Sequence, residues 1–151
     1  MFLVMRFFYR INAVHFALFF VILTIVIPGL VVGILNEFFV FEENRFETNH
    51  TRLFISIFVA PFFETILFQS VAFKYLRKLR FLNDYTITFL SACLFALSHT
   101  DLTTAISSFI GGICFCFAYI ISEKRNWSPF LMVFAIHALR NSFVLVCLNK
   151  V

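Results

Sequence analysis

Residues 53–73 decide the fold, and they read LFISIFVAPFFETILFQSVAF. At 1.5 Å of rise per residue this almost wholly apolar stretch makes a helix about 30 Å long, the thickness of the hydrocarbon layer of a bilayer. One ionisable side chain, Glu64, lies near its middle. Such a group costs several kcal/mol at that depth unless it is paired or lines a wet cavity, so Glu64 is predicted to belong to a functional site.

Four more apolar stretches accompany this one. The five are, in order, Ala13–Leu35, Leu53–Phe73, Tyr85–Ser98, Leu102–Ile121 and Pro129–Leu148. The third is short, but it reaches spanning length if its helix runs from about Phe81 to His99. Of the 151 residues, 62% are hydrophobic, 13% are charged and 25 are phenylalanine, which is more aromatic surface than a soluble domain of this size can bury. The sequence predicts an all-α fold, a polytopic transmembrane bundle of about five spans.

The chain is predicted to form a single membrane domain, because no linker or repeat divides it. Residues 1–52 add a helix and a loop to a four-helix core at about 53–148. The first stretch is expected to be a retained helix rather than a cleaved signal peptide, since its apolar run is long and no small-x-small cleavage site follows. Pro28-Gly29 predicts a kink or an early break in it.

The formal net charge of +4 predicts an orientation in the membrane. Basic residues occur at Arg6 and Arg10, between Lys74 and Arg80, and at Lys124 and Arg125. By the positive-inside rule these segments face the cytoplasm, and residues 36–52 and the C-terminus lie outside. The 36–52 loop mixes phenylalanine with acids and either lies in the interface or extends its flanking helices. Orientation and anionic headgroups explain the basic residues, so no nucleic-acid partner is expected.

Two groups of small side chains are predicted to pack between helices. The four cysteines, all within apolar stretches and without a Cys-x-x-Cys pair, are expected to be apolar packing residues. In the fourth stretch Ser107, Ser108, Gly111 and Gly112 form two overlapping small-x-x-x-small pairs. Such pairs allow close helix approach, either inside the bundle or at a dimer face.

Three further polar side chains lie in or beside the apolar stretches: His99, His137 and Asn141. His137 and Asn141 are four residues apart and therefore share one helix face, as do Phe95 and His99. A carboxylate, two imidazoles and an amide from three different helices predict a buried site for hydrolysis.

These residues also resemble a known family. Residues 60–69, APFFETILFQ, are similar to the first motif of the CPBP intramembrane proteases, which include the CAAX prenyl endopeptidases and the bacteriocin-processing and immunity-type (Abi) proteins. The family motifs are Glu-Glu-x-x-x-Arg, Phe-x-x-x-His, and His-x-x-x-Asn or Asp. Phe95–His99 and His137–Asn141 match the second and third in the right order. The resemblance implies an intramembrane endopeptidase, labelled a metalloprotease, with proton transfer by Glu64.

The chain departs from the first motif at two positions. Thr65 stands where the family has its second Glu, and Gln69 stands where it has Arg. Arg140, three residues after His137, is a candidate for the missing cation, pairing with Glu64 or with a substrate carboxylate. The rival interpretation is that Arg140 snorkels toward the outer interface.

Two mechanisms fit the predicted site. In the first, Glu64 is the general base, His99 orients the water, and His137 and Asn141 donate to the oxyanion. In the second, Glu64, His99 and His137 form a His₂Glu set for a divalent metal such as zinc. Glu64 and His137 fall near mid-bilayer, and the other two toward its outer half, which would open the cavity outward.

The predicted function is hydrolysis of a peptide or membrane-protein substrate within the lipid bilayer, in a bacterial cell (inner) membrane. A different class of function is a catalytically inactive relative that acts as a bacteriocin-immunity protein or a membrane scaffold. A third is a small transporter or proton-conducting protein that uses the same buried groups.

Overall fold

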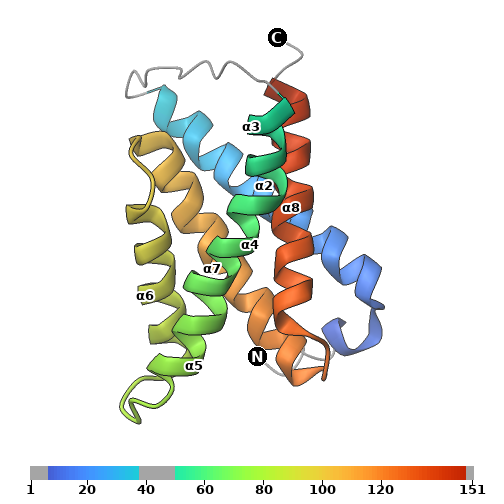
Figure 1. The fold of residues 1–151 in the computed structure, drawn as a ribbon, viewed down its shortest axis with the longest axis vertical. Coiled ribbons are helices and arrows are strands. Elements are labelled where there is room, and N and C mark those ends of the chain that lie inside the picture. Colours follow the sequence, from blue (N-terminus) through green and yellow to red (C-terminus); the bar gives the residue numbers. More distant parts are fainter. Residues whose placement is uncertain (1–6, 38–49, 149–151) are drawn as a thin grey trace.

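The computed structural model describes residues 7–37 and 50–148, which form a bundle of helices with no strand (Figure 1). The helices are α2 (Ala13–Asn36), α3 (His50–Phe54), the π-helix η1 (Ile55–Val59), α4 (Ala60–Glu64), the π-helix η2 (Thr65–Val71), α5 (Ala72–Leu76), α6 (Asp84–Leu97), α7 (Leu102–Lys124) and α8 (Pro129–Leu148). The segments from α3 to α5 are continuous and make one rod, His50–Leu76. The predicted all-α bundle is confirmed, while Arg6 and most of the predicted interfacial loop lie outside the described residues.

Four helices are long and apolar enough to cross a membrane: α2, the α3–α5 rod, α7 and α8. The expected fifth span, α6, has 14 residues and is therefore about 21 Å long, shorter than the hydrocarbon layer. The helix does not run from near Phe81 to His99, the extent at which this stretch would reach spanning length. Asn83 has extended backbone and its side chain accepts the N–H of Thr86 at 2.9 Å, so this cap begins the helix at Asp84.

The N-terminal helix α2 is part of the bundle and packs against α7 and α8. It is a single helix through Pro28, so the early break predicted there does not occur. Phe16 and Phe20 are buried in the main hydrophobic core, and Phe16 meets Trp127 edge-to-face at 5.4 Å between ring centroids. Ala17, Val21 and Leu23 also pack against that core, while much of the remaining apolar surface of α2 is exposed.

Helix α7 is the centre of the bundle. Of its apolar stretch 50% is buried, compared with 17% to 22% for the other three long helices. It packs closely on α6 because Gly112 lacks a side chain: a β-carbon there would lie 3.2 Å from the Cα of Ala92 and 3.1 Å from a ring carbon of Phe95. Gly112 therefore packs inside the bundle, which was one of the two predicted places for the small residues, the other being a dimer face. Cys114 and Cys116 on the same helix are also buried.

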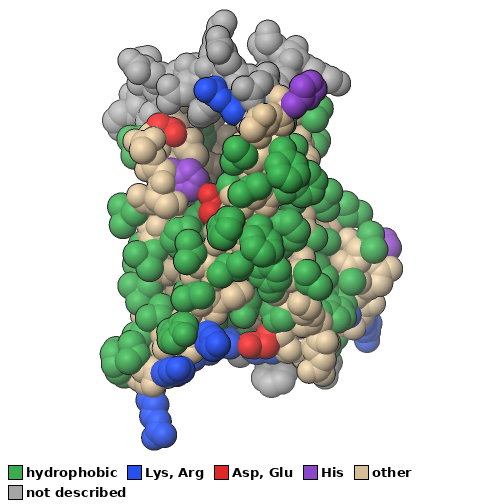
Figure 2. All heavy atoms as spheres, in the orientation of Figure 1, with side chains coloured by type: hydrophobic (Ala, Val, Ile, Leu, Met, Phe, Trp, Pro, Cys, Tyr) green, Lys and Arg blue, Asp and Glu red, His purple; other side chains and the backbone are tan. Residues whose placement is uncertain are grey.

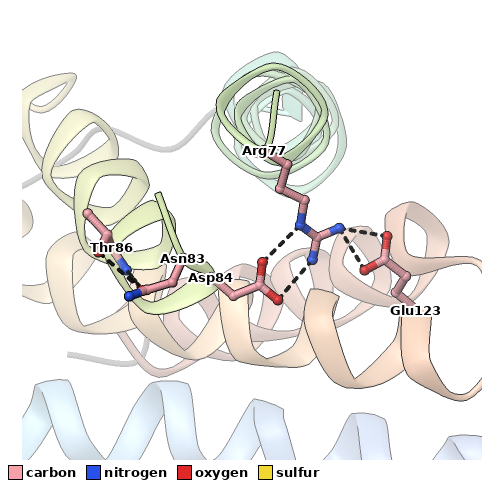
Figure 3. A network of polar contacts seen from close by, with 5 residues as sticks. All are labelled: Arg77, Asn83, Asp84, Thr86 and Glu123. Carbon is pink, nitrogen blue, oxygen red and sulfur yellow. Dashed lines mark hydrogen bonds and ion pairs between the residues drawn. The ribbon is translucent and has the colours of Figure 1, made fainter. Parts of the chain in front are cut away.

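One end of the bundle is held by ion pairs (Figure 3). Arg77, just after α5, contacts Asp84 at 2.9 Å and Glu123 at 2.8 Å, and so ties the start of α6 to the end of α7. Burial opposes its charge, but hydrogen bonds to these two carboxylates outweigh burial and raise the pKa of Arg77. The segments after α5 and after α7 therefore lie at one end, where Figure 2 shows basic side chains gathered, as the predicted topology requires.

We expect Gly112→Ala to lower the melting temperature of the detergent-solubilised protein by several degrees, because its methyl group would press on α6 backbone. Gly111→Ala is the matched control, since its β-carbon would meet only a ring carbon of Phe115 at an ordinary 3.9 Å. Equal melting temperatures for the two variants would contradict this account of the α6–α7 contact.

Candidate active site

Glu64 lies at the junction between α4 and the π-helix η2, in the middle of the rod. A second π-helix, η1, ends a few residues before it. Short π-helical segments within α-helices are rare and are frequently found at functional sites. Glu64 therefore lies between two such segments of one span.

Glu64 and His137 are brought together by the fold. The Oε2 atom of Glu64 lies 3.4 Å from Nε2 of His137 on α8. The side chain of His137 is 2% exposed and that of Glu64 is 25% exposed, so the imidazole is sealed in the core while the carboxylate still reaches the surface.

Aromatic rings fix the orientation of His137. Phe115 lies against its ring at 4.4 Å between centroids with an interplanar angle of 32°, and Phe95 meets it edge-on at 5.7 Å. Nδ1 of His137 is buried and has no hydrogen-bond partner among the described residues. An imidazole that donates from Nε2 to the carboxylate leaves Nδ1 without a proton, in agreement with this environment.

His99 lies just beyond the end of α6 and is held by its own turn. Its Nδ1 is 3.0 Å from the carbonyl oxygen of Phe95, and its ring packs edge-on against the Phe95 ring at 5.2 Å. The Phe-x-x-x-His spacing thus produces both a ring contact and a hydrogen bond. Because a carbonyl can only accept, Nδ1 carries the proton and Nε2 accepts from the hydroxyl of Ser108 at 3.2 Å.

Asn141 is held at both ends of its amide. Its Nδ2 donates to the carbonyl oxygen of Ser56 at 2.9 Å, and its Oδ1 accepts from Arg140 at 3.0 Å. Pro61 explains the first bond. In η1 the N–H of Ala60 donates to the carbonyl of Ile55, and in the same pattern the N–H of residue 61 would donate to the carbonyl of Ser56. Residue 61 is a proline and has no N–H to donate. The amide of Asn141 takes the place of that missing donor.

Arg140 turns inward, which excludes one of its two predicted roles, a side chain that snorkels to the interface. A guanidinium nitrogen donates to the hydroxyl of Ser107 on α7 at 2.9 Å, so the side chain does not snorkel to the interface. Its charge acts on Glu64, but no ion pair within 4 Å joins the two among residues 50–148. The predicted direct pairing with Glu64 is therefore not formed.

The two departures from the family motif are both deep in the core. The side chains of Thr65 and Gln69 are buried, and in the part of the chain that the structure describes neither Oγ1 of Thr65 nor Oε1 of Gln69 has a hydrogen-bond partner. Close by, Ser91 donates to the carbonyl of Phe68 and Cys116 donates to Ser91. The motif positions thus hold a neutral polar cluster.

Sequence reasoning missed four of the contacts that build this site. Ser56, Ser107 and Ser108 bond to the predicted residues, and Phe115 covers the ring of His137. The sequence pattern indicates only small packing residues at the two α7 serines, although a hydroxyl facing a neighbouring helix is also a donor and an acceptor. Nothing in the sequence marks Ser56 or Phe115.

The predicted metal ligands Glu64, His99 and His137 do not converge on one point. Among the described residues, no group of three or more His, Cys, Asp or Glu side chains is arranged to hold a metal ion. His99 is the member that does not fit, because its two ring nitrogens face Phe95 and Ser108. The arrangement therefore does not fit the His₂Glu set.

The neutral cluster predicts a coupled effect of restoring the family residues. Thr65→Glu or Gln69→Arg alone should each destabilise the protein by about 3 kcal/mol or more, because each leaves an unpaired charge in the core. The double variant should recover most of that loss by pairing the two charges. Thermal unfolding in detergent measures the coupling, with Thr65→Val as the neutral control. Losses that simply add would show that the two positions do not form a pair.

A comparison with protein families bears on what this site does. The family model for type II CAAX prenyl endopeptidase Rce1-like proteins matches residues 47–143, nearly two thirds of the chain. The match includes Glu64, His99, His137 and Asn141 and leaves out α2. No curated protein and no solved structure matches the chain significantly. The family match agrees with the resemblance carried by the three motifs, and the chain belongs to the Rce1-like family of type II CAAX prenyl endopeptidases.

Proposed function

We propose that this integral membrane protein is an intramembrane endopeptidase that hydrolyses a peptide bond with a water activated by Glu64. The observation that supports this most is the 3.4 Å contact between Glu64 and His137, formed by two helices of a chain that belongs to a protease family. Inside a bilayer, a carboxylate and an imidazole in contact and partly open to the surface are arranged for proton transfer.

The difference in burial gives the two side chains different tasks. Glu64 is partly exposed, so water and a substrate can reach its carboxylate, whereas His137 is enclosed by Phe95 and Phe115. In the mechanism Glu64 takes a proton from water as the oxygen attacks the carbonyl carbon. When the carbon–nitrogen bond breaks, Glu64 returns that proton to the leaving amine. His137 holds the carboxylate in the attacking position through Nε2.

The part of His99 is to close the site on the α6 side. With Nδ1 donating to Phe95 and Nε2 accepting from Ser108, it can orient a water only after the Ser108 hydroxyl turns away. Its position one turn after Phe95 also keeps that ring against His137. We therefore assign His99 a positioning role.

The substrate we propose is a peptide or membrane protein that approaches from within the bilayer, in a bacterial cell (inner) membrane. The family name supports a peptide with a prenylated C-terminal CAAX sequence as the first probe. The exposed hydrophobic side chains beside Glu64, Phe63 and Leu67, give an apolar approach to the carboxylate from the lipid side.

Glu64→Gln should lower kcat by about 10²- to 10⁴-fold on a quenched fluorescent CAAX peptide in liposomes, because the amide cannot accept the water proton. The melting temperature should stay within a few degrees, since the change is nearly isosteric. Glu37→Gln is the matched control, because Glu37 is an exposed carboxylate at the end of α2.

The same experiment tests the alternative of an inactive relative that binds a peptide or scaffolds a membrane complex. Such a protein would bind the probe without cleaving it, and Glu64→Gln would leave that binding unchanged. Wild-type protein that binds prenylated and unprenylated probes and cleaves neither would contradict the proposed protease.

Metal analysis of the purified protein tests the divalent cofactor that the resemblance implies. From the side-chain arrangement we expect well below one zinc ion per chain, and a content that His99→Ala does not change, because the ring nitrogens of His99 already have partners. One tightly held zinc that is lost on His99→Ala would show that the side chains rearrange into a metal site.

A further inference from the structure

Hydrolysis also requires a donor for the negative oxygen of the tetrahedral intermediate, and the contacts around Asn141 bear on which group supplies it. One N–H of the Asn141 amide donates to Ser56 and its oxygen accepts from Arg140, which leaves one uncharged N–H on Nδ2. The direction of that second N–H is set by the first bond, the one that replaces the missing N–H of Pro61. That bond joins α8 to the rod that carries Glu64, so breaking it would loosen the site.

Arg140 has a positive charge, which Asn141 lacks, and more free donors. A guanidinium has five N–H donors, and the contacts of Arg140 account for two of them, to the neutral oxygens of Asn141 and Ser107. Its Nε is buried and has no partner among the described residues. Residues 7–37 and 50–148 place no carboxylate within 4 Å of it, although Glu64 is near enough for the two charges to interact.

A cation in this state is suited to an anion that appears only during the reaction. Its neutral partners fix its position without neutralising it, so its field is available when charge develops on the substrate. Glu64, whose carboxylate interacts with this cation, loses its negative charge when it takes the water proton. The attraction between Arg140 and Glu64 therefore weakens as the oxyanion forms, and the guanidinium can interact with the oxyanion instead.

We propose that Arg140 stabilises the oxyanion and that Asn141 is a positioning residue that holds Arg140. This inference rests on the proposed function. As water attacks, the carbonyl π electrons move to the carbonyl oxygen, which the guanidinium binds, and the proton goes to Glu64. On collapse the carbonyl re-forms, the carbon–nitrogen bond breaks and Glu64 protonates the amine. His137 keeps its contact with Glu64 throughout.

Kinetics of Arg140 variants on the prenylated CAAX peptide test this role. Arg140→Gln should lower kcat by about 10²- to 10³-fold while KM changes little, because the lost interaction exists only in the transition state. Arg140→Lys should recover part of kcat, since it keeps the charge but not the fork of donors. Arg80→Gln, an exposed arginine after α5, is the control that should leave both parameters unchanged.

A cycle with Asn141→Ala separates positioning from direct catalysis. If Asn141 acts through Arg140, Asn141→Ala should lower kcat in the wild-type chain and have little further effect in the Arg140→Gln chain. Multiplicative losses would show that Asn141 donates to the oxyanion independently and would overturn its positioning role. Melting temperatures of all variants separate these effects from unfolding.

Binding of a peptide phosphinate gives a readout that does not depend on turnover. Its anionic tetrahedral phosphorus group resembles the intermediate, so Arg140→Gln should weaken its binding about as much as it lowers kcat, while Glu64→Gln should retain it. The opposite outcome is that Arg140→Gln raises KM for peptides with a free C-terminal carboxylate but not for the corresponding peptide amides. That result would make Arg140 a carboxylate-binding residue and overturn the proposal. Failure of wild-type protein to cleave would contradict the proposed function, whereas cleavage that needs Glu64 but not Arg140 would contradict only this inference.

Discussion

The structure depends on one constraint: inside a bilayer, a polar side chain must find its partner within the protein. The contact between Glu64 and His137 meets that requirement for a carboxylate and an imidazole together, and it fixes how the α3–α5 rod faces α8. The rings of Phe95 and Phe115 then close the space around the imidazole. The close approach of α7 to α6 at Gly112 positions Phe95, so packing far from the carboxylate contributes to the geometry at the carboxylate.

A proline organises the other side of the site. Pro61 is a weak point in a transmembrane helix because it withholds an N–H, and a carbonyl left without a donor in lipid is costly. Here the carbonyl of Ser56 accepts from Asn141, and Asn141 in turn accepts from Arg140, which is also bound to Ser107. The polar groups of three helices are thus connected through one missing backbone donor. The same connection holds a cation inside the bundle without neutralising it.

The departures at Thr65 and Gln69 are easier to understand as a pair. Relative to the family motif the chain has lost one acid and one base from the same buried region, so no single charge is left unpaired there. What remains is a small neutral polar cluster between η2, α6 and α7. The charges near the reacting groups are therefore those of Glu64 and Arg140, on different helices and not in direct contact.

The sequence alone determined the helical membrane class, because long apolar runs with isolated polar residues are compatible with few folds besides a transmembrane bundle, and its three motifs indicated the family. It could not give the length of α6, which depends on whether Asn83 caps a helix or continues a turn, nor the continuity of α2 through Pro28. The tertiary structure alone decided which groups face each other: that His137 rather than His99 contacts Glu64, that His99 bonds to Ser108, and that Arg140 turns inward. The reason is physical. Spacing along one helix fixes a shared face, but the π-helical turns on either side of α4 and the packing of separate helices rotate those faces by amounts that no local pattern contains.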